Sequence, residues 1–292
     1  GTFGAAIAAA KLLQLTEEET VHALGNAGTQ AAGLWEFIED GAMTKQLHSG
    51  KASMNGILAA LLAQKGFTGP LKILEGNRGF FKAMSDEYDV TKITEGLGSE
   101  FKIMENSFKI HASCRHTHHA IDLLIEVFKK NNPKFEEIES ITVKSYKAAI
   151  DITNNDDPKT EYAAKFSLQF CSALAILKGS AGLTDFNEST LWDSQIRALL
   201  KRVNVGIDSR IDASYPEKWG SMVEVVLTNG EIISKETDFP KGDPENAVTS
   251  DELIEKFKHM TGQHPPENKQ QIIDSILELE IMDNISALMA KV

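Results

Sequence analysis

The hydrophobic periodicity of this chain changes twice along its length, and each change marks a different kind of fold. From residue 1 to about residue 100, apolar residues recur with helical spacing. The stretch GAAIAAAKLLQL (4–15) predicts a helix of small residues suited to close packing, and Thr16 with Glu19 forms a capping box for the next helix. Residues 50–64 predict another buried helix. The first hundred residues are therefore predicted to be all-α.

The second region, from about residue 104 to residue 240, mixes helical and strand patterns. VEVVLTNGEIISK predicts two strands joined at Asn229-Gly230, a dipeptide that favours the tight turn of a β-hairpin. The other predicted elements are a helix over 117–130, a strand over 141–146 and one long helix through AAKFSLQFCSALAILKG (163–179). This region is predicted to be α+β.

The last region becomes helical again, with amphipathic patterns over 251–260 and 268–288. We therefore expect a mainly α protein with an α+β part. A large helical domain would be built from residues 1–103 and 241–292, and a smaller α+β lid domain, residues 104–240, would be inserted between them.

Composition limits the partners of the chain. Its 292 residues carry 42 acidic and 30 basic side chains, a formal charge of −12, which argues against binding to a nucleic-acid backbone. A small anion held in a locally basic pocket remains compatible with this charge. No apolar run reaches the length of a membrane span, so no membrane partner is expected. The two distant cysteines, Cys114 and Cys171, predict no disulfide framework and favour a cytoplasmic location.

The stretch GAMTKQLHSGKAS (41–53) is the first candidate site. Lys45 and His48 are three residues apart and would share one face of a helix, beside small residues that leave room for a ligand. This arrangement suits an anion site. The alternative is a polar connection between helices in which Lys45 and Lys51 are solvated.

The stretch HASCRHTHH (111–119) is the second candidate, with three possible interpretations. Zinc would need Cys114, His116 and His118 to converge from an extended segment, and no second ligand pair follows at a familiar spacing. The stretch could also be a helix start with exposed imidazoles. The third interpretation is an acid/base or anion site, because a helix that begins near Thr117 directs its free N–H groups forward, and Arg115 and Lys109 add positive charge. Such a site would favour a polycarboxylate.

The stretch AAKFSLQFCSA (163–173) is the third candidate. Lys165, Ser167 and Gln169 interrupt an otherwise buried helix face. One or two of these side chains could face a cleft, or they could be ordinary polar positions of an amphipathic helix.

Several blocks in this order and spacing resemble the MmgE/PrpD family, and together they cover essentially the whole chain. The blocks are GTFGAAIAAAKLL, QAAGLWEFIEDGAMTKQLHSGKAS, GFTGPLKILEGNRGFF, CRHTHHAID, AKFSLQFCSALA and FPKGDPENAVTSDELIEKF. The family contains 2-methylcitrate dehydratases, cis-aconitate decarboxylases and iminodisuccinate epimerases. The resemblance implies a helical domain and an α+β lid with the active site in the cleft between them, and it suggests a homodimer.

The resemblance also implies lyase chemistry on a small polycarboxylate, without a metal or another cofactor. A base removes the weakly acidic proton next to a carboxylate, and fixed positive charge stabilises the enolate-like intermediate. Carried over to this sequence, Lys45, Lys109 and His118 are the expected catalytic residues. Arg115 and Thr2 are expected to bind substrate, and so is His48, which lies in the same stretch as Lys45.

Two departures from the family pattern change these expectations. Family members carry a histidine shortly before the GTFG block and an aspartate further upstream, whereas this chain begins at Gly1. A truncated and impaired enzyme is therefore expected. Phe170 stands where the family often has tyrosine, which makes decarboxylation less favoured than loss of water. The alternatives are an epimerase or decarboxylase of a related dicarboxylate, and a non-catalytic binding or assembly module.

Overall fold

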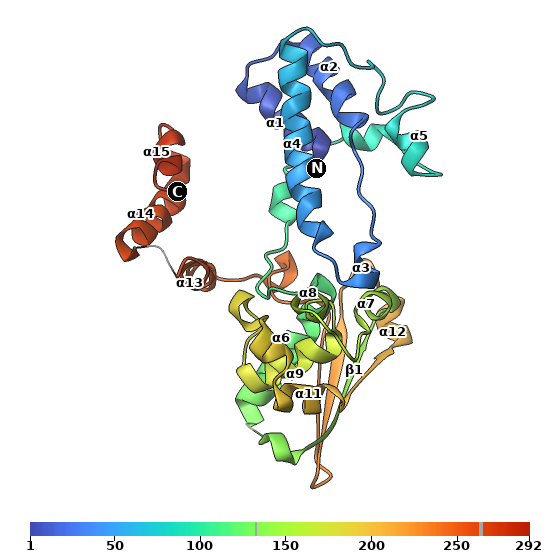
Figure 1. Cartoon of the computed structure of the whole chain (residues 1–292), viewed down its shortest axis with the longest axis vertical. Helices are drawn as coiled ribbons and strands as arrows, with labels where there is room; N and C mark the ends of the chain where they lie inside the picture. The colour runs from blue at the N-terminus through green and yellow to red at the C-terminus, as the bar shows by residue number, and fades with distance from the viewer. Residues whose placement is uncertain (132, 263–264) are drawn as a thin grey trace. The chain divides into compact units, whose positions relative to one another are not determined.

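The protein forms two compact units in a computed structural model that describes residues 1–131, 133–262 and 265–292. Unit 1 comprises Gly1–Lys102 and unit 2 comprises Ile103–Val292 (Figure 1). The boundary at residue 102 lies one residue from the end predicted for the first helical segment. That residues 241–292 complete the helical domain stays a prediction.

Unit 1 is helical: residues 1–102, all of which the structure describes, contain no strand. Its helices are α1 (Thr2–Leu12), α2 (Glu17–Gly28), α3 (Phe37–Asp40), α4 (Thr44–Gln64) and α5 (Phe80–Met84). The predicted small-residue helix and the helix over 50–64 are confirmed, although α4 begins earlier, at Thr44. The predicted capping box is also present, with Thr16 Oγ1 accepting from the Glu19 amide at 3.2 Å.

Small residues let α1, α2 and α4 pack closely. Ala6, Ala27 and Ala59, one from each helix, are fully buried against one another. At Gly56 in α4, a Cβ atom would lie only 2.7 Å from the Thr2 carbonyl oxygen and 2.6 Å from the Ala6 amide nitrogen. Because backbone atoms cannot move aside as a flexible side chain can, only glycine allows α1 and α4 this approach.

Unit 2 contains a four-stranded mixed sheet in the order β2-β1-β3-β4. The strands are β1 (Ile138–Ser145), β2 (Val203–Ile207), β3 (Ser221–Leu227) and β4 (Ile232–Thr237). The predicted hairpin is confirmed, since β3 and β4 are antiparallel neighbours and Gly230 takes a left-handed φ of 85° in the turn between them. The edge strand β2, which pairs in parallel with β1, was not predicted.

Helices pack on the sheet and form the main core of unit 2. They are α6 (Arg115–Asn131), α7 (Lys147–Thr153), α8 (Glu161–Ala164), α9 (Leu168–Lys178), α10 (Glu188–Leu191), α11 (Ser194–Leu200) and α12 (Ser209–Asp212). Figure 1 shows α6, α9 and α11 on one side of the sheet. Fully buried side chains from α6, α9, β1 and β3 meet there, among them Leu124, Leu174, Val143 and Val223.

Two helix predictions were wrong in their length. The long helix over 163–179 is interrupted because Ser167 is extended and caps α9: its hydroxyl accepts from the Phe170 amide at 2.9 Å and donates to the Asn155 carbonyl at 2.5 Å. The helix over 268–288 is divided into α14 (Pro266–Leu277) and α15 (Ser286–Met289). The Asn284 side chain accepts from the Ser286 amide at 2.9 Å, a local bond that competes with helix continuation.

The remaining predicted elements agree with the structure. The predicted strand over 141–146 corresponds to the second half of β1 and the residue after it. The predicted helix over 117–130 is α6, and the predicted helix over 251–260 is α13 (Ser250–Met260). No helix among the described residues combines the length and apolar character needed to cross a bilayer.

Candidate functional site

The histidine-rich stretch forms the turn before α6 and the first turns of that helix. Ser113 and Thr117 share a hydroxyl–hydroxyl bond of 2.8 Å, and Thr117 also donates to the Cys114 carbonyl at 2.9 Å. These bonds turn the chain into the helix, which begins at Arg115. Because α6 is helical, Arg115 and His118 share one face, while His116 and His119 share another.

Arg115 forms an ion pair with Asp243, which lies in the loop after β4. The arginine side chain is 15% exposed and the aspartate 10% exposed, so the pair is largely withdrawn from water. Arg115 Nη1 also donates to the Lys241 carbonyl and to His118 Nδ1, both at 3.3 Å, and Ser107 donates to the Asp243 carboxylate at 2.5 Å. The guanidinium group is therefore held in one orientation.

A second pair of bonds ties the loop after β4 to α6. The Asp122 carboxylate accepts from the Lys241 amide at 2.8 Å and contacts His111 Nε2 at 2.8 Å. Gly242 permits this approach: its φ is 97°, and a Cβ atom there would lie 2.0 Å from the Phe108 carbonyl oxygen. The loop and the first turns of α6 therefore form one connected structure.

His118 is fully buried and neutral. Burial, together with His111, Arg115 and Lys109 nearby, holds its pKa well below its ordinary value. Since the guanidinium can only donate, His118 Nδ1 accepts from Arg115, and the proton sits on Nε2, which faces the Ser113 carbonyl at 3.4 Å. His118 is thus a neutral imidazole that positions Arg115, while Lys109 on the exposed surface adds positive charge to the same region.

The other histidines of the stretch face different partners. The His116 ring stacks on Trp219 with centroids 4.9 Å apart, and its Nδ1 bonds the Tyr146 hydroxyl at 2.7 Å. His119 contacts the Ser145 hydroxyl at 3.3 Å, and burial lowers its pKa to about 3. Within the described ranges, no three His, Cys, Asp or Glu side chains lie close enough together to hold a metal ion.

In unit 1, Lys45 and His48 lie in the first two turns of α4, as their spacing predicted. The His48 ring makes an edge contact with Phe37, with centroids 5.6 Å apart, whereas Lys45 is exposed. Thr2 is buried in the first turn of α1, and its carbonyl oxygen lies beside Gly56 of α4. At 1.5 Å per residue, that contact is about 16 Å along α4 from Lys45.

The predicted site residues therefore form two groups. Lys45 and His48 lie together on α4 of unit 1, with Thr2 apart from them; Arg115, His118 and Lys109 lie together in unit 2. That both groups line one cleft stays a prediction.

Sequence reasoning missed the acidic residues Asp122 and Asp243 as partners of this group. Asp122 could have been found from the sequence, because it lies four residues after His118 within the predicted helix over 117–130 and hence on the same helix face. Asp243 could not be identified in this way. It lies in the block FPKGDPENAV, and no local sequence pattern indicates an ion pair with a residue 128 positions away.

Comparisons with known proteins agree with the resemblance. The MmgE/PrpD N-terminal domain matches residues 1–92 and the MmgE/PrpD C-terminal domain matches residues 111–279. A cis-aconitate decarboxylase-like protein, oryM, of Aspergillus oryzae is 28% identical over 99% of this chain and 63% of its own length. The cis-aconitate decarboxylase of Aspergillus terreus is 23% identical, over 99% and 62%.

A mitochondrial 2-methylcitrate dehydratase of Yarrowia lipolytica is 26% identical over 90% of this chain and 53% of its own length. The chain thus spans less than two thirds of the length of these curated relatives.

Proposed function

The chain belongs to the MmgE/PrpD family, and from this premise we propose that the protein is a lyase on small polycarboxylates, which removes water from an acid of the 2-methylcitrate or citrate type to give a product of the aconitate type. The reaction would begin with abstraction of the proton next to a carboxylate. The observation that carries the proposal is the fixed guanidinium of Arg115, held beside the neutral His118 and near Lys109.

Positive charge is what such a reaction needs most. Removing a proton next to a carboxylate places negative charge on carboxylate oxygens, and fixed cations stabilise that charge without reorganising during the reaction. Arg115 has five N–H donors, and three N–H···acceptor contacts are described for it. We propose that a substrate carboxylate accepts from its remaining donors.

We propose Lys45, Lys109 and His118 as catalytic residues, and Thr2, His48 and Arg115 as substrate-binding residues. A neutral His118 can accept a proton, but its Nδ1 already accepts from Arg115. Proton transfer through this nitrogen would require Arg115 to exchange that contact for one with the substrate carboxylate. Substrate binding and activation of the base would then be coupled.

Decarboxylation of cis-aconitate is the second candidate, supported by the names of the Aspergillus relatives. Phe170 bears on this alternative. Its ring is fully buried in the core of unit 2, with its centroid 6.1 Å from that of Phe186. A mechanism that needs a tyrosine hydroxyl at this position has none in this chain, which favours loss of water. Epimerisation of a related dicarboxylate, a homodimer and a cytoplasmic location remain predictions.

The experiment compares dehydration with decarboxylation, using the protein purified from the organism that produces it. 2-Methylcitrate, citrate and cis-aconitate are supplied separately, and double-bond formation is followed by ultraviolet absorbance while released CO2 is measured in parallel. Dehydration of 2-methylcitrate or citrate without CO2 release is the expected result. CO2 release from cis-aconitate would instead identify a decarboxylase, and calorimetric binding without any turnover would identify a binding module.

The matched variants are Lys45→Ala and Lys51→Ala, which lie two turns apart on α4 and are both exposed. Loss of a positioned acid/base group is expected to lower kcat by about 10² to 10⁴ for Lys45→Ala. Lys51→Ala should keep its turnover. Unchanged turnover in Lys45→Ala would show that the catalytic assignment is wrong.

A further inference from the structure

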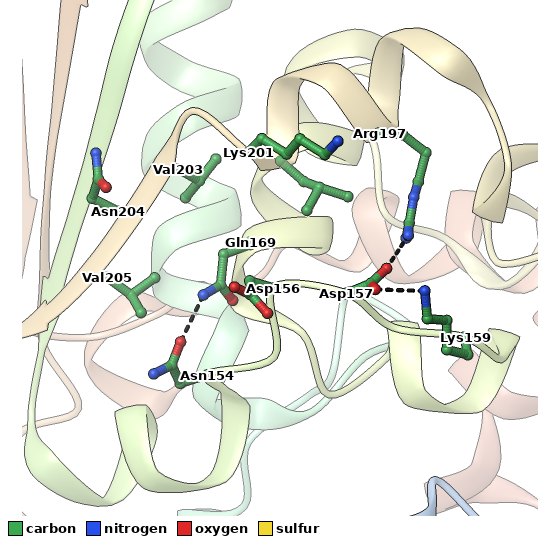
Figure 2. Close-up of a pocket in the computed structure, with 11 residues that line it drawn as sticks. Asn154, Asp156, Asp157, Lys159, Gln169, Arg197, Lys201, Val203, Asn204 and Val205 are labelled. Atoms are coloured by element: carbon green, nitrogen blue, oxygen red, sulfur yellow. Dashed lines mark hydrogen bonds and ion pairs between the residues drawn. The ribbon is translucent and has the colours of Figure 1, made fainter.

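Unit 2 contains a pocket that shares no residue with the Arg115 group. Its volume is about 780 Å³, within the range of small-molecule sites. It lies between the loop after α7, the first turn of α9, the end of α11 and the edge strand β2 (Figure 2). Gln169, one of the three polar residues that interrupt the apolar pattern of 163–173, lines it.

One side of the pocket carries a group of internal ion pairs in which two cations share one carboxylate. Asp157 pairs with Lys159 at 2.5 Å and with Arg197, and Arg197 also donates to the Pro158 carbonyl at 3.1 Å. Figure 2 shows Asp157 between these two cations. These bonds hold the three side chains together, and this side keeps one net positive charge.

The buried floor of the pocket contains an unsatisfied acceptor. Gln169 is 3% exposed, and its Nε2 donates to Asn154 Oδ1 at 2.7 Å. Its Oε1 has no hydrogen-bond partner in the part of the chain that the structure describes. A buried polar atom without a partner is unfavourable by roughly 1–3 kcal/mol. A ligand N–H or O–H donor that reached this atom would remove that cost.

The lining also contains two side chains of opposite charge that have no partner among the described residues. Among the described residues, Asp156 and Lys201 each lack a hydrogen-bond or ion-pair partner for the side chain, and both are exposed. In Figure 2, Asp156 lies beside Gln169, while Lys201, the residue after the end of α11, lies near Arg197. The pocket thus offers a carboxylate and a carbonyl acceptor on one side and an ammonium group on another.

We propose that this pocket binds a free α-amino acid in its zwitterionic form. The ligand ammonium donates to Gln169 Oε1 and Asp156, and the ligand carboxylate pairs with Lys201. A polycarboxylate is disfavoured at the Gln169 end of the pocket, where Asp156 and Gln169 Oε1 both repel an anion. The lining residues that the structure describes include no aromatic ring, which argues against a nucleoside or a sugar that needs a stacking surface.

Titration calorimetry of the full chain with the common L-amino acids tests the proposal. The tightest of them is then compared with its amine, which lacks the carboxylate, and with its 2-hydroxy acid, which lacks the ammonium. Each analogue is expected to bind at least about tenfold more weakly, since each loses one charge-assisted contact. The proposal is overturned if no amino acid binds at millimolar concentration, or if the 2-hydroxy acid binds as tightly.

Two exposed variants locate the site without disturbing the core. Asp156→Asn should weaken amino-acid and amine binding at least about tenfold, and Lys201→Met should weaken amino-acid and 2-hydroxy-acid binding similarly. The matched controls are Asp283→Asn and Lys178→Met, exposed residues of unit 2 outside the pocket, which should change nothing. Amino-acid binding that survives both pocket variants would place the ligand elsewhere and refute the assignment.

Discussion

Arg115 in the first turn of α6 and Asp243 in the loop after β4 form an ion pair across 128 residues of sequence. The pair fixes the charge most important to the proposed reaction, and it joins the loop to the helix. Because both side chains are withdrawn from water, its loss should affect stability as well as chemistry.

Asp243→Asn tests this pair. Leaving Arg115 buried without its counter-charge should lower the free energy of unfolding by about 3 kcal/mol. Urea unfolding is followed by the fluorescence of Trp192 and Trp219 in a Trp35→Phe background, so that the signal reports on unit 2. The control is Asp238→Asn, which breaks the exposed pair between Lys218 and Asp238 and should change stability by less than about 1 kcal/mol. Equal effects in the two variants would contradict a special role for the Arg115 pair.

Acid should destabilise unit 2 through its buried histidines. His118 and His119 are held neutral, so the unfolded chain binds protons that the folded chain does not. Stability is therefore fully present above the unfolded pKa of 6.5 and falls as the pH is lowered. For His119 the loss continues down to about pH 3 and reaches about 2 kcal/mol at pH 5.

The measurement is the free energy of urea unfolding across this pH window, for the wild type and for His119→Asn. The variant should show a shallower pH dependence, by up to one proton. An identical slope in both proteins would mean that His119 is not held neutral by the fold.

Close packing of α1 on α4 gives a prediction for unit 1. Gly56→Ala should lower stability by about 2 kcal/mol, because the added methyl group meets backbone atoms of α1. Gly50→Ala is the matched control on the same helix, where a Cβ atom meets nothing within 4 Å. Better helix propensity should make that variant slightly more stable, by about 0.5–1 kcal/mol. Thermal unfolding followed by circular dichroism distinguishes the two, and a stabilised Gly56→Ala would contradict the packing described.

The cap of α9 gives a further prediction. Ser167→Ala removes the acceptor for the Phe170 amide and the donor for the Asn155 carbonyl, so a loss of about 2 kcal/mol is expected. Urea unfolding measures the change. Ser167→Thr keeps the hydroxyl and should recover part of the loss; if alanine and the wild type are equally stable, the serine does not act as the cap.

Local patterns were sufficient for most elements of the fold. The capping box at Thr16 and the turn at Asn229-Gly230 involve partners within four residues of each other. Both features could therefore be predicted from a short stretch of sequence. Helical periodicity likewise identified α6 and the part of α4 from residue 50 onward. The shared face of Lys45 and His48 depended on that helix beginning earlier, at Thr44.

Local patterns failed where a distant partner decides the outcome. β2 is a five-residue strand that forms by pairing with β1, about sixty residues earlier in the chain. The break before α9 depends partly on Ser167 reaching the Asn155 carbonyl. In both cases the stabilising hydrogen bond joins two segments that are separate in the sequence. The periodicity of one segment contains no information on its partner.

The candidate site divides in the same way. The sequence by itself placed His118 in the first turn of a predicted helix and Arg115 just before it, whereas the structure begins the helix at Arg115, so that the two share a face. Only the tertiary structure decided that Asp243 pairs with Arg115 and that His118 is buried and uncharged. It also decided that Gln169 lines a pocket with an oxygen that has no partner among the described residues. Charge state and hydrogen-bond satisfaction depend on burial and on distant partners, and these exist only once the chain has folded.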